Sequence, residues 1–159
     1  MNRDSEKGQA LAEFALMLPL FALLLMPTID FGRVFYFGMT LTQAVRAGAQ
    51  YGISQDVVSA DPTAFATIAG NIKAAAVATG SNIGLTTAQV TTADRYWRCG
   101  GDPTSTKNTN FPIPADQCVG DTQLIYVRVI ATSTLTTMFS YSWLSSSWTL
   151  TKSAEMRVQ

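Results

Sequence analysis

The sequence predicts an α+β fold: a long N-terminal transmembrane and amphipathic helix, a second helix, and then a small antiparallel sheet. Three observations predict it. An apolar run over residues 10–29 passes into a segment whose apolar residues recur every three or four positions. A helix-start signal at Asp61-Pro62 and a stop at Gly80 bracket a second helical pattern. Segments nearer the C-terminus alternate apolar and polar residues, as half-buried strands do.

The composition narrows the function classes. The chain has 159 residues, enough for one domain of ordinary size. Its 11 basic and 11 acidic residues cancel, which argues against an electrostatic nucleic-acid binder. Histidine is absent, so the commonest general base and metal ligand are missing. We find no catalytic triad, Cys–His pair, phosphate loop or dinucleotide fingerprint. We therefore expect a protein that is not an enzyme and needs no cofactor or metal.

The apolar N-terminal run has the length of a membrane span. Residues 10–29 carry a single charge, Glu13, and a helix of that length covers about 30 Å, the thickness of the hydrocarbon core. Pro19 and Pro27 fall inside it, and prolines are tolerated in membrane helices. A buried core helix and a cleavable secretory signal are the alternatives. A signal would require a small-residue cleavage site after the apolar core, and no convincing one follows.

The helical pattern continues beyond the span and predicts one long helix over residues 9–52. Its second half is amphipathic, and Asp30 and Arg33 are spaced to form an ion pair where the helix leaves the membrane. Ala44, Gly48 and Gly52 form a ladder of small residues that lets another backbone approach closely. Two alternatives stay open for this ladder: packing against the protein's own sheet, or contact with a partner helix.

The remaining residues, 53–159, are expected to form an exported α+β domain. A second helix is predicted over 62–79, with Asp61 as its N-cap and an apolar stripe that packs on a sheet. The stripe consists of Phe65, Ile68, Ile72, Ala75 and Ala76. Strands are predicted over 85–92, extending towards Trp97, over 123–131, and over 148–158. The segment 134–147 could form a short helix or a packed loop.

Two strands show clear alternation. In the second, Ile125, Val127 and Val129 share one face. In the third, the shared face holds Trp148, Leu150, Ala154 and Met156, with Lys152 among them. These apolar faces should meet the helices.

The two cysteines, Cys99 and Cys118, enclose a loop rich in glycine and proline. In an oxidising compartment they would most simply form a disulfide, and closing a loop of this size contributes about 3 kcal/mol in the chain-entropy model. A metal site is disfavoured because there are only two thiols and no histidine.

The N-terminal sequence resembles a known family. The run G-Q-A-L-A-E-F, at residues 8–14, is similar to the processing signal of class III prepilins, specifically the TadE-like pseudopilins of tight-adherence (Flp-type) pilus systems. The charged leader M-N-R-D-S-E-K-G precedes it. The following I-D-F-G-R-V-F and T-Q-A-V-R-A-G-A-Q-Y-G resemble the rest of the family's N-terminal block, and T-L-T-K-S-A-E-M-R-V-Q resembles its last strand.

The resemblance implies a function for each feature of this block. Residues 1–8 would be a prepilin leader, cut by a prepilin peptidase between Gly8 and Gln9. Glu13, followed by Phe14, would pair with the α-amine that cleavage creates, its own or a neighbour's, because a carboxylate in an apolar setting is costly unless paired. Before cleavage, Glu13 is expected to snorkel to the membrane interface. Cyclisation of an N-terminal Gln9 would abolish the pairing.

The resemblance also implies a location, a role and partners. We expect a single-pass protein of the bacterial inner membrane, with a cytoplasmic N-terminus and a periplasmic or extracellular domain, associated with the pilus. The basic residues Arg3 and Lys7 give a weak preference for this orientation. The role would be that of a minor pseudopilin in assembly, initiation or tip formation of a filament with a pilin-like fold. Expected partners are the peptidase, the inner-membrane platform, other pseudopilins, the major pilin and membrane lipid, but no nucleic acid. The alternative is a signal-anchored periplasmic binding module that is not processed as a prepilin.

Overall fold

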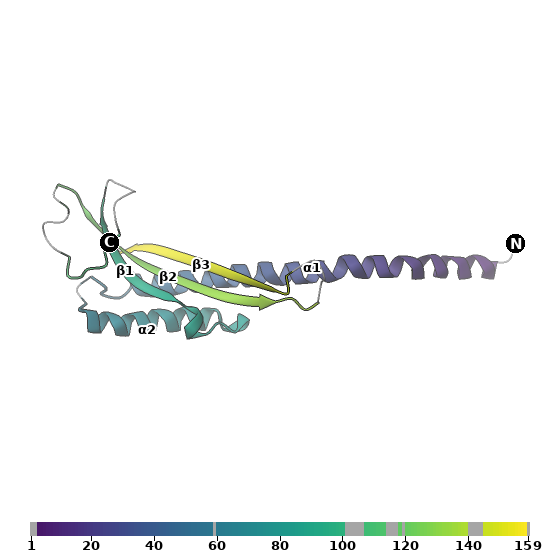
Figure 1. The fold of residues 1–159 in the computed structure, drawn as a ribbon, viewed down its shortest axis with the longest axis horizontal. Coiled ribbons are helices and arrows are strands. Elements are labelled where there is room, and N and C mark those ends of the chain that lie inside the picture. The colour runs from purple at the N-terminus through teal and green to yellow at the C-terminus, as the bar shows by residue number, and fades with distance from the viewer. Residues whose placement is uncertain are drawn as a thin grey trace. The chain divides into compact units, whose positions relative to one another are not determined.

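The computed structural model describes residues 3–58, 60–100, 107–113, 118, 120–139 and 145–158, with only the backbone of residues 3–8 and 10. The chain divides into two compact units. The N-terminal unit comprises Met1–Tyr36 with Leu135–Trp148, and the sheet unit comprises Phe37–Thr134 with Thr149–Gln159. The element order is long helix, second helix and three strands (Figure 1), which confirms the predicted α+β class.

The first helix, α1, runs over Arg3–Ile53 and contains both Pro19 and Pro27. The helix therefore begins within residues 1–8, the segment that the family resemblance assigns to a leader. A proline cannot donate to the carbonyl four residues earlier, yet the helix continues through both. Next to the second proline, the Thr28 hydroxyl donates to the Leu24 carbonyl at 2.8 Å, so this hydroxyl is satisfied inside the helix.

The second helix, α2, runs over Pro62–Thr79, as predicted. The Asp61 carboxylate accepts from the Ala64 N–H at 2.7 Å and satisfies one of the free donors of the first turn. Gly80 ends the helix with a negative φ of −91°. Space explains this glycine, because a Cβ there would lie 2.7 Å from the Leu85 Cδ2 atom.

One predicted strand was wrong. Residues 85–90 are not a strand: a 3₁₀ turn, η1, covers Ser81–Ile83, and a second, η2, covers Thr87–Gln89. The cause is local capping, since the Thr86 N–H donates to the Gln89 side-chain oxygen at 2.8 Å. The strand β1 begins only at Thr92 and runs to Cys99.

The sheet has the order β1-β2-β3, with β2 over Gln123–Thr136 and β3 over Ser147–Val158. β1 and β2 pair antiparallel, with Ala93 opposite Val129 and Trp97 opposite Ile125. β2 extends five residues beyond the predicted end at Ala131. Of the predicted short helix or loop over 134–147, residues 140–144 lie outside the described residues, and the flanking parts form the ends of β2 and β3 or non-helical backbone.

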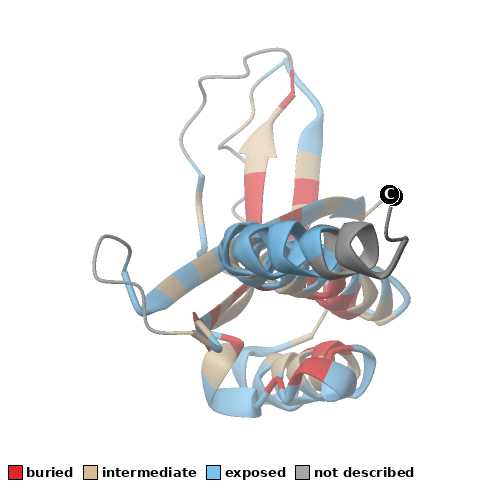
Figure 2. Cartoon of the chain, turned by 90° about the vertical axis from the view of Figure 1, so that its right-hand side faces the viewer, coloured by how far each residue is buried: buried red, intermediate tan, exposed pale blue. Residues whose placement is uncertain are grey.

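The core of the sheet unit lies where the second half of α1, α2 and one face of the sheet meet (Figure 2). The predicted inward residues of β2 are buried, and on the predicted face of β3 Ala154 is buried while Leu150 and Met156 pack against the core. From α2, Ile72 and Ala76 are buried, with Phe65 and Ile68 beside them. The second half of α1 is therefore amphipathic because one side of it completes this core.

Candidate functional site in the N-terminal helix

The predicted cleavage bond, between Gly8 and Gln9, lies within the helical backbone of α1. The Gln9 side chain is exposed, and its Nε2 donates to the Glu13 Oε1 at 3.2 Å. Glu13 is therefore within reach of the residue four positions earlier, on the same helix face. Phe14 is 60% exposed. The structure thus places Gln9 and Glu13 together in the uncleaved chain.

The segment of α1 that follows is apolar on all sides and exposed. Among the described residues, one helix, over Leu11–Ile53, is long and apolar enough to cross a membrane by length and composition, and 6% of its most apolar stretch is buried. Leu16 is 81% exposed and Leu23 is 66% exposed. A helix that is hydrophobic on every side and unsheltered by its own chain needs an apolar environment. This is consistent with a single-pass membrane protein, and among the described residues nothing buries the apolar segment as a core helix would be buried.

The end of the apolar segment carries a buried carboxylate that is held at several points. Asp30 is 6% exposed, and it forms the predicted ion pair with Arg33 at 3.5 Å. Its carboxylate also accepts from the backbone N–H groups of Met138 at 2.9 Å and Phe139 at 3.4 Å. Arg33 donates to the Thr136 carbonyl at 3.5 Å. The sequence predicted the ion pair but not the link to the turn between β2 and β3.

The small-residue ladder lies in the sheet unit and packs against the chain's own elements. A Cβ at Gly48 would lie 3.1 Å from the Ile72 carbonyl oxygen and 3.2 Å from the Ala76 Cβ. A Cβ at Gly52 would lie 2.7 Å from the Val127 Cγ1. Ala44, the third member, is fully buried. Of the two alternatives, packing against the protein's own α2 and β2 accounts for the ladder.

Cys99 and Cys118 form the predicted disulfide, with their Cα atoms 5.5 Å apart. Cys99 is the last residue of β1 and pairs with Gln123, the first residue of β2. The bridge therefore closes the connection between these strands at its base. The loop folds back at one described point, where Asn108 exchanges two backbone hydrogen bonds of 2.9 Å with Trp97.

A buried guanidinium, which the sequence analysis did not single out, contacts both this loop and the α1–α2 connection. Arg95, 5% exposed, donates to the Val57 carbonyl and, at 2.7 Å, to the Ala60 carbonyl. Its charge lies 4.5 Å from the Phe65 ring centre and 4.0 Å from that of Phe111. Burial lowers the pKa of Arg95. The contacts are those of a structural clamp rather than of a ligand site.

The opposite face of the sheet carries a network of aromatic and charged side chains. The rings of Tyr96 and Tyr126 stack with centres 5.2 Å apart. The Tyr96 hydroxyl donates to Glu155 at 2.9 Å, and Lys107 lies 2.7 Å from the same carboxylate. Burial, with the Glu155 hydrogen bond second, raises the pKa of Tyr96 to about 12. Burial alone would raise the pKa of Glu155, but the hydrogen bonds from Lys107 and Tyr96 lower it overall.

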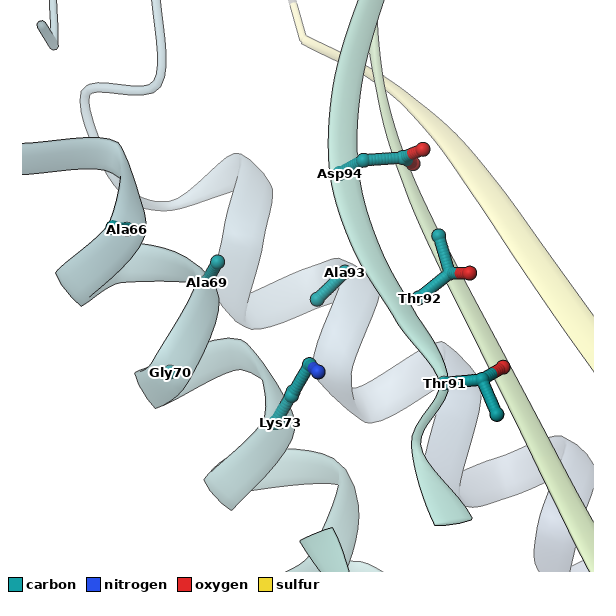
Figure 3. A pocket seen from close by; sticks show the side chains of 8 residues that line it. All are labelled: Ala66, Ala69, Gly70, Lys73, Thr91, Thr92, Ala93 and Asp94. Atoms are coloured by element: carbon teal, nitrogen blue, oxygen red, sulfur yellow. The ribbon is translucent and has the colours of Figure 1, made fainter. Parts of the chain in front are cut away.

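A shallow groove of about 490 Å³ lies between α2 and the start of β1 (Figure 3). Small residues of α2, such as Ala69 and Gly70, line one side, with Lys73 beside them. On the β1 side, the Asp94 carboxylate is already bound by Arg128 at 2.6 Å. Among the described residues no group of His, Cys, Asp and Glu could hold a metal ion. The groove therefore offers no evident chemistry.

Comparison with protein families agrees with the N-terminal features. Residues 8–50 match the family described as TadE-like protein. Comparisons with curated proteins and with solved structures returned no match. The matched range includes the predicted cleavage bond, Glu13, the exposed apolar segment, Asp30 and two members of the small-residue ladder. Over residues 8–50, this chain is similar to TadE-like proteins.

Proposed function

We propose that this protein is a minor pseudopilin, anchored in the bacterial inner membrane by α1 and acting structurally in assembly, initiation or tip formation of a tight-adherence pilus. The observation that carries the proposal is the TadE-like match over residues 8–50, which indicates a protein associated with such a pilus. Support comes from the exposed apolar surface of the same segment, since an unsheltered helix of this kind requires lipid or other helices around it.

Hydrolysis of the Gly8–Gln9 peptide bond is the first proposed step. Addition of water by a prepilin peptidase would leave a carboxylate on Gly8 and a new α-amine on Gln9. The bond lies near the N-terminal end of α1, and helix ends fray more readily than helix interiors. A glycine costs a helix about 1 kcal/mol relative to alanine, so Gly8 makes local opening for the peptidase easier.

Glu13 is proposed to become the partner of the new amine. In the uncleaved chain its carboxylate accepts from the Gln9 side-chain amide at 3.2 Å, so the two residues are already within reach. Cleavage would replace the preceding backbone by a cationic amine and would leave Glu13 near a new helix N-terminus, where negative charge is favourable. An uncompensated carboxylate in the membrane would be costly. Pairing within one chain therefore stabilises the cleaved protein in the membrane, and pairing between neighbours favours the assembled state.

The proposed topology has the N-terminus in the cytoplasm and the sheet unit in the periplasm or outside the cell. The disulfide supports it, because such bonds persist in oxidising compartments and are rare in the cytosol. The prepilin peptidase, the inner-membrane platform, other pseudopilins and the major pilin are the proposed partners. No role in catalysis is proposed.

Complementation of a deletion strain tests this function. Wild type should restore piliation, whereas Gly8→Leu, which should block cleavage, and Glu13→Ala, which should insert but lack the pairing, should not. Gly32→Leu is the matched control, because a Cβ at Gly32 meets nothing within 4 Å in the folded chain. Membrane fractions must contain equal amounts of each variant. Full piliation with Gly8→Leu would favour the alternative, a signal-anchored binding module whose helix is only a tether.

A further inference from the structure

β1 is an edge strand, and only part of its outer side is covered. The sheet order β1-β2-β3 leaves one side of β1 without a neighbouring strand. On that side, the Trp97 N–H and C=O groups exchange two backbone hydrogen bonds of 2.9 Å with Asn108. A segment from elsewhere in the chain therefore already pairs with the outer side of β1, near its end at Cys99.

The backbone of Ala93 faces the same way as that of Trp97. Along a strand, successive residues direct their N–H and C=O groups to opposite sides, so residues four positions apart share a side. Ala93 lies four residues before Trp97, so its N–H and C=O groups point away from β2. Within the described part of the chain, neither group has a hydrogen-bond partner on that outer side. An unpaired edge of this kind is a template for another strand.

The groove of about 490 Å³ between α2 and β1 opens along this unpaired stretch (Figure 3). Residues 91–94 line one wall, so about four residues of an added strand would fit beside them, because paired strands advance in step. On the α2 wall, Ala66 and Gly70 are exposed, and a Cβ at Gly70 would meet nothing within 4 Å. Unlike Gly48 and Gly52, Gly70 is not required by packing within the chain, and it leaves room for another backbone.

The groove presents one charge that the chain does not neutralise, and this charge is positive. The ionisable residues in its lining are Lys73 and Asp94. The Asp94 carboxylate is bound by Arg128, which donates to it at 2.6 and 3.1 Å. Lys73 forms no ion pair with any of the described residues. A segment that enters the groove therefore meets an ammonium group, which favours a carboxylate.

We infer that this groove is a strand-addition site, which binds an extended segment of a partner protein that carries an acidic side chain. The segment pairs with the outer side of β1 through the Ala93 N–H and C=O groups, and its carboxylate contacts Lys73. Backbone pairing supplies the affinity, while the small residues of α2 and the ammonium group select small and acidic side chains. All the residues concerned lie in the sheet unit, and the inference rests on neither membrane insertion nor a role in a pilus.

Selection from a random dodecapeptide library against the full-length protein in detergent tests the inference. The best peptide is then titrated by fluorescence polarisation against variants that circular dichroism shows to be folded. Ala93→Pro removes the outward N–H and keeps the pairing with β2, since proline is tolerated where the N–H of a strand faces outward. Ala93→Ser keeps the N–H and is its control. Gly70→Leu fills the groove, and its control is Asn71→Leu, at an exposed position of the same helix outside the groove lining.

We expect the selected peptides to be acidic, and Ala93→Pro and Gly70→Leu each to weaken binding about tenfold. The two control variants should bind within about twofold of wild type, as surface changes outside an interface do. Lys73→Gln should weaken binding about threefold, as the loss of an exposed ion pair does, and Lys73→Glu should weaken it more. In wild type, the bound peptide should protect the Ala93 amide from hydrogen exchange.

Three results would overturn the inference. If no peptide is enriched on wild type over Gly70→Leu, the groove is not a binding site. If binding survives Ala93→Pro and leaves the Ala93 amide unprotected, the peptide does not pair with β1. If the enriched peptides are basic, or bind Lys73→Glu more tightly than wild type, the partner is not acidic, and Lys73 instead keeps this edge unpaired.

Discussion

Gly52→Ala is expected to destabilise the sheet unit although alanine is the better helix former. The new Cβ would lie 2.7 Å from the Val127 Cγ1 and 3.0 Å from the Ile72 Cδ1, and both side chains are fully buried. Valine is stiff at χ1, so it cannot turn its methyl away cheaply. Overpacking of this kind costs about 1–3 kcal/mol. The gain in helix propensity is at most about 1 kcal/mol, and less beside the last helical residue. We expect a net loss of about 1–2 kcal/mol.

The matched control is Gly38→Ala in the same helix, where a Cβ meets nothing within 4 Å. There the propensity gain is unopposed and should stabilise by about 0.5–1 kcal/mol. Both full-length variants are purified in one detergent, and near-ultraviolet circular dichroism follows the melting of the sheet unit. Gly52→Ala should lower Tm by roughly 4–8 °C relative to wild type. A Gly52→Ala protein as stable as Gly38→Ala would refute the close packing of α1 on α2 and β2.

Three further predictions concern the sheet unit. Replacing Cys99 and Cys118 by alanine should cost about 2–4 kcal/mol, and without prior reduction the denatured wild type should take up no alkylating reagent. Arg95→Lys should cost about 1–3 kcal/mol in denaturant unfolding, because one ammonium cannot replace a guanidinium that bridges two carbonyls between two rings; unchanged stability would contradict the clamp. Because the pKa of Glu155 is lowered in the folded state, its stabilisation is present above its ordinary value of 4.5 and lost as pH falls below it. The stability difference between wild type and Glu155→Gln should therefore shrink on acidification, and a constant difference would count against the ion pair with Lys107.

The elements that the sequence predicted best are those with local signals. α2 could be bounded at both ends because Asp61-Pro62 and Gly80 act on their own neighbours. The apolar and amphipathic halves of α1 follow from periodicity over many turns. The strand predicted over 85–92 was wrong because of another local interaction. Threonine favours strands, but the local hydrogen bond between Thr86 and Gln89 outweighed that preference.

The features that could not be predicted depend on distant partners. Asp30 looked like a surface ion pair, because its amide donors at Met138 and Phe139 lie 108 and 109 residues away in the chain. Arg95 had no role predicted from the sequence, yet its side chain is buried and its guanidinium donates to backbone carbonyls of the α1–α2 connection. For the small-residue ladder, the sequence could not decide between packing within the protein and contact with a partner helix. The contacts of Gly48 and Gly52 with α2 and β2 decide for packing within the protein.

The central claim, that the protein is processed as a prepilin, is tested most directly by the intact mass of the membrane-purified protein. The protein is expressed with and without its cognate prepilin peptidase, and Gly8→Leu is carried through the same steps. We predict that the peptidase removes residues 1–8 from wild type and leaves Gln9 as the N-terminus, free or lighter by one ammonia if it has cyclised. The Gly8→Leu variant should keep its leader. A wild-type protein that retains Met1 in the presence of an active peptidase would contradict the claim.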